Sequence, residues 1–313
     1  MTVESAGEGM RAEAGVAAVD AAVVLLEGTD ARRFANGMFT QNVRDLAAGQ
    51  GKRSGWADDR GRLLGLMDLL ALGPDAFLLV LDTPTSEGFR ERFERFVVFD
   101  DVEIRDLDRA VLTVQGPRAE EVVRAAGLEV PAGAFSGGPE GVLVHRRDRT
   151  GLGGFDLLLP PAERGAREAG LRAAGALAAT AADLELLRVE AGLIRLDQDV
   201  PDKAFAHELG LRETILDFEK GCYVGQEIIN RMDTRANVRR ALVGLAFEAE
   251  LPAAGAALLG EGKKVGKVTS PTSSPRFGPI GLAVVRKPWD APGAVLRVEG
   301  GGTATVQALP FGS

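Results

Sequence analysis

The chain has 313 residues, of which 45% are hydrophobic and 26% are charged, which is typical of a soluble globular protein with two or three domains. Its formal net charge of −8 argues against nonspecific nucleic-acid binding, because such binding depends on neutralised phosphates. No apolar run approaches the roughly 20 residues that span a bilayer, and the N-terminus lacks the basic start and apolar core of a signal peptide. We therefore expect neither membrane association nor direct nucleic-acid binding.

The single cysteine, Cys222, excludes an internal disulfide and favours a cytoplasmic protein. Two histidines and one cysteine do not make a Cys/His metal cluster, so we expect no metal site within one chain. The acidic balance and the lack of an obvious exposed apolar helix favour a monomer.

The first part of the chain alternates helical and strand patterns. The turn at residues 58–61 separates two strand-like segments and predicts a hairpin. Apolar residues at i, i+4, i+7 and i+8 predict an amphipathic helix over residues 89–97. Other predicted elements are a short helix over residues 29–38, a strand over 76–81, a strand over 111–115, a helix opening at Pro117, a strand over 155–159, and helices over 161–179 and 183–191.

After residue 236 the sequence changes to short strand-like segments between glycines and prolines. Several such segments at this spacing predict a small β-barrel or sandwich. The predicted strands cover residues 241–247, 264–269, 281–285, 294–298 and 303–308.

Residues 220–227, with the letters KGCYVGQE, contain the only cysteine and the only tyrosine of the chain. The apolar stretch 214–218 stops directly before this glycine-bracketed loop, and residues 226–232 have the pattern of a helix. Cys222 would then lie near a helix N-terminus, where free N–H groups and Lys220 would stabilise a thiolate. A reactive or metal-contacting thiol and an inert buried cysteine are both compatible with the pattern. Gln226 and Glu227 could contact a polar ligand or cap the helix.

This loop resembles the signature of the YgfZ family of folate-binding proteins, which is related to the aminomethyltransferase of glycine cleavage, the T-protein. The resemblance covers nearly the whole chain, with landmarks at residues 34–43, 114–117, 187–192 and 239–245. It implies an α+β, three-domain, cloverleaf-like aminomethyltransferase fold with a small C-terminal β-barrel. The implied domains are residues 1–50 together with 136–235, residues 51–135, and residues 236–313.

The resemblance also implies that tetrahydrofolate binds in a central opening and that iron-sulfur enzymes are the client partners. Glu190 matches a T-protein position that contacts folate, and a carboxylate can accept two adjacent pterin N–H groups. Glu190 could instead be a helix-surface carboxylate that pairs with Arg188. Arg240 matches the basic position that would bind the folate tail. The further folate-binding candidates are Asn42, Glu208, Tyr223, Gln226 and Glu227.

One departure from the T-protein pattern concerns catalysis. Aminomethyltransferases carry an acidic residue on the strand after the first hairpin, and this position falls on Leu66 here. Asp68 lies two residues later and so on the same face of a strand, or it is an edge or solvent-exposed carboxylate. The candidate catalytic residues are therefore Cys222, Lys220 and Asp68.

Three functions follow from these expectations. The first is a tetrahydrofolate-binding accessory protein for the assembly or repair of iron-sulfur enzymes. The second is a folate-dependent aminomethyltransferase or demethylase that transfers a one-carbon unit to tetrahydrofolate. The third is a folate-binding regulatory module without catalysis.

Overall fold

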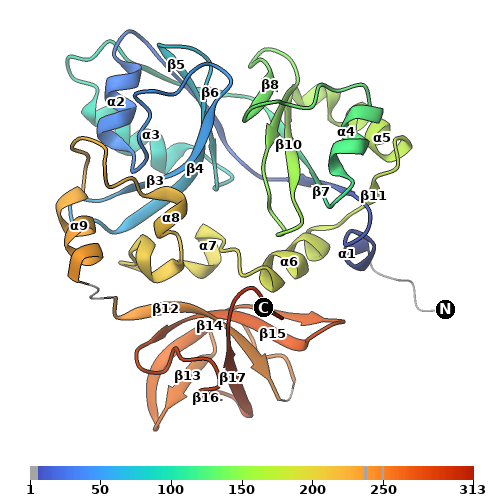
Figure 1. Cartoon of the computed structure of the whole chain (residues 1–313), viewed down its shortest axis with the longest axis vertical. Coiled ribbons are helices and arrows are strands. Elements are labelled where there is room, and N and C mark those ends of the chain that lie inside the picture. The colour runs from blue at the N-terminus through green and yellow to red at the C-terminus, as the bar shows by residue number, and fades with distance from the viewer. Residues whose placement is uncertain (1–5, 236–237, 249) are drawn as a thin grey trace.

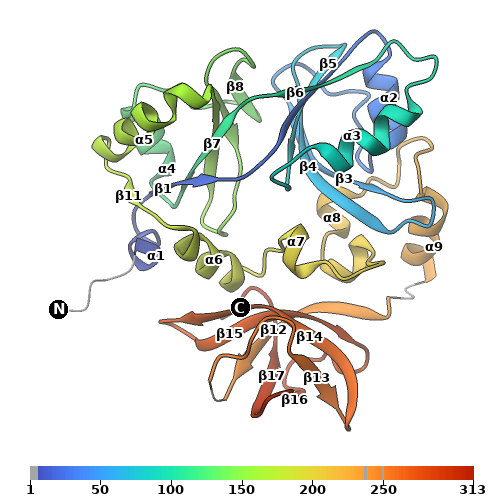
Figure 2. The ribbon, with the colours of Figure 1, turned by 180° about the vertical axis from the view of Figure 1, so that it is seen from behind.

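The computed structural model describes residues 6–235, 238–248 and 250–313. Figures 1 and 2 show three lobes: two lobes that each combine a β-sheet with helices, and a barrel formed by the last part of the chain. The helices α6 (Ala181–Glu190), α7 (Leu196–Asp199) and α8 (Arg212–Ile215) lie between the barrel and the other two lobes.

The first lobe contains a five-stranded antiparallel sheet in the order β3-β4-β5-β2-β6. Helices α2 (Ala31–Met38) and α3 (Glu87–Phe93) cover one face, where phenylalanine rings pack together, with the rings of Phe89 and Phe93 4.6 Å apart. The strands are β2 (Val23–Glu27), β3 (Gly51–Ala57), β4 (Leu63–Ala71), β5 (Ala76–Leu81) and β6 (Glu103–Leu107).

The second lobe contains a six-stranded sheet in the order β11-β1-β7-β10-β9-β8, in which only the β1–β11 pair is parallel. Its strands are β1 (Gly15–Val19), β7 (Ala110–Gln115), β8 (Phe135–Gly137), β9 (Leu143–Arg146), β10 (Gly154–Leu159) and β11 (Leu177–Ala178). Helices α4 (Ala119–Ala125) and α5 (Arg164–Ala173) pack on this sheet, and the short α1 (Ala6–Gly9) precedes it.

The two sheets pack against each other through one apolar cluster. Val23, Leu70 and Val80 of the first sheet meet Leu143 and Leu158 of the second. The chain crosses between the sheets twice, between β1 and β2 and between β6 and β7 (Figure 2). This arrangement ties the two lobes into a single support for the segment that follows.

The third lobe is a closed barrel in the order β12-β15-β14-β13-β16-β17. Its strands are β12 (Arg240–Phe247), β13 (Ala257–Gly260), β14 (Lys263–Ser274), β15 (Gly278–Arg286), β16 (Val295–Val298) and β17 (Thr303–Gln307). Val189 of α6 packs on Ile280 and Leu282 of β15. Helix α9 (Gln226–Arg235) precedes the barrel.

Most predicted elements are confirmed, including the β3–β4 hairpin, α9 and the C-terminal barrel. The strands β1, β6, β8, β9, β11 and β13 were not predicted. The helix over 89–97 was predicted too long: α3 ends at Phe93, a 3-10 turn follows, and Phe96 is 42% exposed. The helix over 161–179 ends at Ala173, because Gly175 adopts a left-handed φ of 107° and the chain continues into β11. The helix expected at Pro117 begins at Ala119.

Strand pairing divides the chain at other points than the predicted boundaries near residues 50 and 135. Strand β2 belongs to the sheet of β3 to β6, and β7 belongs to the sheet of β8 to β11. The crossings at residues 20–22 and 108–109 contain no glycine or proline, so the sequence has no turn signal at either point.

Candidate functional site

The cysteine loop, residues 214–225, lies along the segment 37–42 at the end of α2. Hydrogen bonds that hold the two segments together include Thr40 Oγ1 to Ile215 O at 2.5 Å, Gln41 Nε2 to Thr214 O at 3.2 Å, Asp217 N to Thr40 O at 3.1 Å, and Val224 N to Gly37 O at 3.2 Å. The loop is therefore anchored on the first lobe before the chain enters α9.

Lys220 is buried beneath this loop, with an exposed fraction of 5%. Its Nζ donates to Phe39 O at 2.5 Å and to Gln41 O at 2.8 Å, and lies 4.7 Å from the ring centre of Tyr223. Burial lowers the pKa of Lys220 to about 7. The ammonium thus contacts backbone carbonyls of segment 37–42, where it joins the two segments.

Cys222 and Tyr223 have opposite environments. Cys222 is exposed, whereas Tyr223 is 7% exposed and packs with Leu66 and Ile229 in an apolar cluster. Burial raises the pKa of Tyr223 to about 12, and its hydroxyl has no hydrogen-bond partner in the described part of the chain. The thiol of Cys222 is therefore exposed, while the neighbouring Tyr223 is buried. Cys222 is not the buried cysteine considered as the alternative above.

Glycine is required at two positions of the loop for different structural reasons. Gly225 has a φ of 84°, and a Cβ there would lie 2.5 Å from Asp58 O and 3.0 Å from the Cα of Gly61. Glycine at 225 thus allows the start of α9 to approach the β3–β4 turn. Gly221 has no such angle, but a Cβ there would collide with Nη2 of Arg44.

The two polar residues that open α9 have few contacts. Gln226 Nε2 lies 3.5 Å from Lys220 O, a long separation for a hydrogen bond. Glu227 is exposed and pairs with Arg231 on the same helix at 3.0 Å. Asn42 is half-buried, and its Oδ1 accepts a hydrogen bond from Arg44 N at 3.0 Å.

Arg240 and Glu208, both predicted to bind folate, pair with each other. Arg240 Nε and Nη2 donate to the two carboxylate oxygens of Glu208 at 2.9 and 2.7 Å, and Phe205 N donates to Glu208 Oε2 at 3.1 Å. Glu208 is 4% exposed, and Nη1 of Arg240 has no hydrogen-bond partner among the described residues. Arg240 is therefore the more accessible member of the pair, with one edge of its guanidinium free.

Glu190 ends α6 and lies between the N-terminal segment and the barrel. Arg11 Nη2 donates to Glu190 Oε2 at 2.5 Å, and Ser274 Oγ donates to Oε1 at 2.7 Å. Arg188, the partner considered in the sequence, instead binds Glu185 and Asp199. Residues two apart on a helix point in different directions, which explains why this pairing was wrong.

Asp68 lies on β4, an interior strand of the first sheet, and is buried at the contact between the two sheets. Its carboxylate lies 3.3 Å from Arg53 Nη1 and 3.4 Å from Arg147 Nε. Burial alone would raise the pKa of Asp68, but the charges of Arg147 and Arg53 outweigh it and hold this pKa below its usual range. Asp68 is therefore neither an edge nor a solvent-exposed carboxylate, while Leu66 is buried in the apolar cluster with Tyr223.

The sequence reasoning missed this group of buried charges between the sheets. It includes Arg53, Asp82 and Arg147 around Asp68, and His145, whose Nδ1 has no partner within the described residues. An aspartate within the apolar strand 63–71 was the one available signal. Its partners come from β3, from the end of β5 and from the chain after β9, which strand patterns alone do not bring together.

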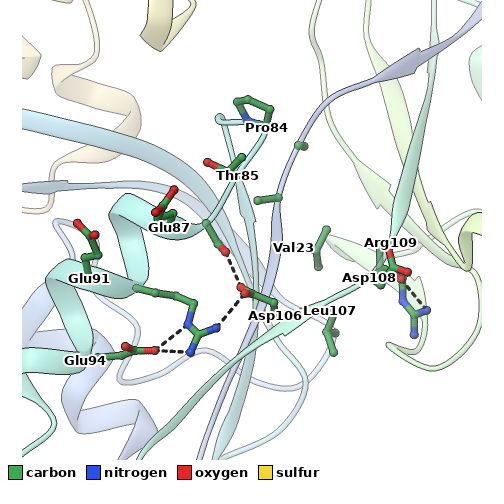
Figure 3. Close-up of a pocket in the computed structure, with 14 residues that line it drawn as sticks. Val23, Pro84, Thr85, Glu87, Glu91, Glu94, Asp106, Leu107, Asp108 and Arg109 are labelled. Atoms are coloured by element: carbon green, nitrogen blue, oxygen red, sulfur yellow. Dashed lines mark hydrogen bonds and ion pairs between the residues drawn. The ribbon is translucent and has the colours of Figure 1, made fainter.

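A surface groove of about 550 Å³ lies elsewhere, between α3 and the β6–β7 crossing (Figure 3). Arg90 on its wall binds Glu94 and Asp106, and the lining contains none of the predicted site residues. Within residues 6–235, 238–248 and 250–313, no group of three His, Cys, Asp or Glu side chains could hold a metal ion. No helix in the same ranges is long and apolar enough to cross a membrane.

The two packed sheets, the connecting helices and the barrel form an aminomethyltransferase-type fold. The profile of the GCVT N-terminal domain matches residues 3–220, and that of the glycine cleavage T-protein C-terminal barrel domain matches residues 240–311. The chain belongs to the glycine cleavage T-protein family.

Relatives and one solved structure agree with this assignment. The aminomethyltransferase of Rubrobacter xylanophilus is 30% identical over 92% of this chain and 80% of its own length. A putative chloroplastic transferase of Arabidopsis thaliana is 26% identical over 92% of this chain and 68% of its own. The crystal structure of the glycine cleavage system aminomethyltransferase T from Bartonella henselae superposes with a TM-score of 0.89 at 25% identity, covering 98% of this chain and 88% of that one. The predicted fold class is confirmed.

Proposed function

We propose that this protein binds tetrahydrofolate and acts as an accessory factor for the assembly or repair of iron-sulfur enzymes, with Cys222 as its working thiol. Folate binding is supported by membership of the T-protein family and by the chemistry of the Arg240–Glu208 pair. A guanidinium with a free edge suits the carboxylates of the folate tail, and a carboxylate suits the N–H groups of a pterin. Arg240 would bind the folate tail through its free edge while Glu208 holds its guanidinium in place, and Glu190 would accept the pterin N–H groups in exchange for its bonds to Arg11 and Ser274.

The accessory role is carried by one observation, the exposure of Cys222 in a loop whose other residues anchor it. Lys220 fixes the loop from below and Gly225 fits it against the β3–β4 turn, so the thiol is presented to partners from a supported position. The resemblance of residues 220–227 to the YgfZ signature supports the same reading. The buried Leu66 at the position where the transferases carry an acid argues against glycine cleavage as the main activity.

Complementation of a bacterial strain that lacks its own YgfZ-type protein tests the accessory role. The intact protein is expected to restore iron-sulfur enzyme activity, and Cys222→Ala at equal expression is expected to fail. Because Cys222 is exposed, this substitution leaves the core intact. Equal rescue by both proteins would show that the accessory role does not need the thiol of Cys222.

A second function, one-carbon transfer to tetrahydrofolate, is favoured by the names of the relatives, several of which are aminomethyltransferases matching about 92% of this chain. An assay for methylene-tetrahydrofolate formation from an aminomethylated carrier protein or from N-methylated glycine tests it. Turnover that is insensitive to Cys222→Ala would favour this function over the accessory role.

A further inference from the structure

Strand β6 is the outer strand of the five-stranded sheet, and it pairs only with β2 among the described residues. Gly28, directly after β2, donates from its N–H to Asp75 O at 3.0 Å, so alternate residues of β2 counted back from Gly28 bond to β5. The residues between them bond to β6, and one of these is Leu25, which lies opposite Arg105. The backbone groups of Arg105 therefore face β2, and those of Ile104 face outward from the sheet.

Two exposed side chains of opposite charge, Glu103 and Arg105, lie on one face of this open edge. Two copies of β6 that pair antiparallel around a two-fold axis bring outward-facing residues opposite each other, so the axis passes through a residue. An axis through Glu103, Arg105 or Asp106 sets that charged residue against its own copy, and like charges directly opposite are destabilising. An axis through Ile104 instead sets Glu103 of each copy opposite Arg105 of the other. The register centred on Ile104 is therefore the one that charge favours.

The same axis relates an exposed apolar segment to the surface groove. Val98 and Phe99 precede β6 and are exposed, Phe99 to 97%. The groove of about 550 Å³ in Figure 3 is lined by Leu107 and Arg109 at the other end of β6. Because Phe99 and Arg109 are each five residues from Ile104, a rotation about Ile104 carries Phe99 of each copy toward the groove of the other.

We propose that two copies of this chain associate through β6 into a symmetric dimer, with the two strands antiparallel around Ile104. Backbone hydrogen bonds between the two β6 edges supply the pairing, as when an extended segment adds to an open sheet edge. Two Glu103–Arg105 pairs fix the register, and Phe99 of each copy covers the groove of the other. Because both copies use the same surface, the association closes at two. The proposal depends neither on folate nor on Cys222, and it differs from the monomer expected from composition.

Sedimentation velocity of the intact protein in about 0.15 M salt tests the dimer. With rising concentration the mass is expected to approach twice the 32.9 kDa of one chain. Glu103→Arg sets arginines against arginines across the axis, and Arg105→Glu sets glutamates against glutamates, so each variant is expected to bind itself at least about tenfold more weakly. Phe99→Ser, which removes the exposed ring, is expected to weaken the dimer as well. Arg124→Glu, the same charge reversal on α4, is expected to leave the dimer unchanged.

The equimolar mixture of Glu103→Arg and Arg105→Glu is the decisive sample. Each pair of arginines then meets a pair of glutamates, so the two variants are expected to bind each other more tightly than either binds itself. Arg105 also pairs with Glu27 of its own chain at 3.3 Å, but the loss of this contact persists in the mixture, so recovery there reports the contact between copies. An intact protein that stays monomeric at every concentration, a dimer unaffected by both reversals, or a mixture no tighter than its components would overturn the proposal.

Discussion

Arg240 binds Glu208 through two parallel hydrogen bonds, at 2.9 and 2.7 Å, so the first residue of the barrel holds a buried carboxylate of the 3-10 turn Ala206–Leu209. The pair joins the barrel to the segment that carries the cysteine loop. Two residues that the sequence assigned separately to folate therefore act as one unit in the structure.

Replacing Arg240 with alanine is expected to cost about 2–3 kcal/mol of unfolding free energy, because a carboxylate that is 4% exposed loses its charged partner. The neighbouring Arg239→Ala removes an exposed side chain and is expected to stay within about 0.5 kcal/mol. Urea unfolding of both variants measures the difference. Equal stabilities would mean that the pair does not support the barrel contact.

The two glycines of the cysteine loop are expected to respond differently to alanine. Gly225→Ala combines a left-handed φ of 84° with a backbone collision against Asp58, and is expected to lose about 3 kcal/mol. Gly221→Ala meets only the end of a flexible arginine and is expected to change the unfolding free energy by less than about 1 kcal/mol. The urea midpoints of the two variants measure this difference in stability. A loss of unfolding free energy in Gly221→Ala as large as that in Gly225→Ala would contradict the account of this loop.

Lys220 is expected to make stability rise with pH above neutrality. Its pKa is about 7 in the folded protein against 10.5 in its ordinary state, so between these values the unfolded chain binds more protons. The cost of burying the ammonium is complete below pH 7 and is relieved as the pH rises, by about 1.4 kcal/mol per pH unit at most. Unfolding free energies of the intact protein and of Lys220→Met between pH 6 and 9 measure this.

The unfolding free energy of the intact protein should increase relative to that of Lys220→Met as the pH rises above 7. Lys267→Met, at an exposed lysine of β14, serves as the control and should run parallel to the intact protein. A difference that is constant with pH would show that Lys220 does not titrate in this range.

Asp82 is expected to contribute to acid unfolding. Burial raises its pKa, but the charges of Arg53 and Arg147 dominate and lower the pKa of Asp82 from 3.8 to about 2. Its stabilising contribution, about 2 kcal/mol, is present above pH 4 and is lost as the pH falls toward 2. Asp82→Asn should flatten the stability profile between pH 4 and 2, whereas Asp108→Asn, at an exposed site, should not. An unchanged profile in Asp82→Asn would count against the inter-sheet ion pairs.

Periodicity and turn residues were sufficient to predict the local elements, such as the hairpin at residues 58–61 and the short strands of the barrel. They could not predict the sheet order, because a strand pattern does not name its neighbour. Strand β2 pairs with β5 and β6 rather than with β1, although only residues 20–22 separate β1 from β2.

The exposure of the cysteine loop was predictable from the sequence, but the contacts of the candidate residues were not. The glycine-bracketed polar loop correctly indicated an exposed thiol, yet Lys220 was expected beside the thiol and instead binds carbonyls about 180 residues earlier in the chain. Glu190 likewise pairs with Arg11, 179 residues away. Such long-range pairs depend on how the lobes pack, which composition and spacing do not encode.

Isothermal titration of the intact protein with tetrahydrofolate under anaerobic conditions tests the central proposal most directly. We expect saturable binding, an affinity at least about tenfold weaker in Arg240→Ala, equivalent to about 1.4 kcal/mol, and unchanged binding in Arg124→Ala on α4. The variants are compared at a temperature where each is folded. An intact protein that shows no binding, or Arg240→Ala binding as tightly as the intact protein, would contradict a folate site at the Arg240–Glu208 pair.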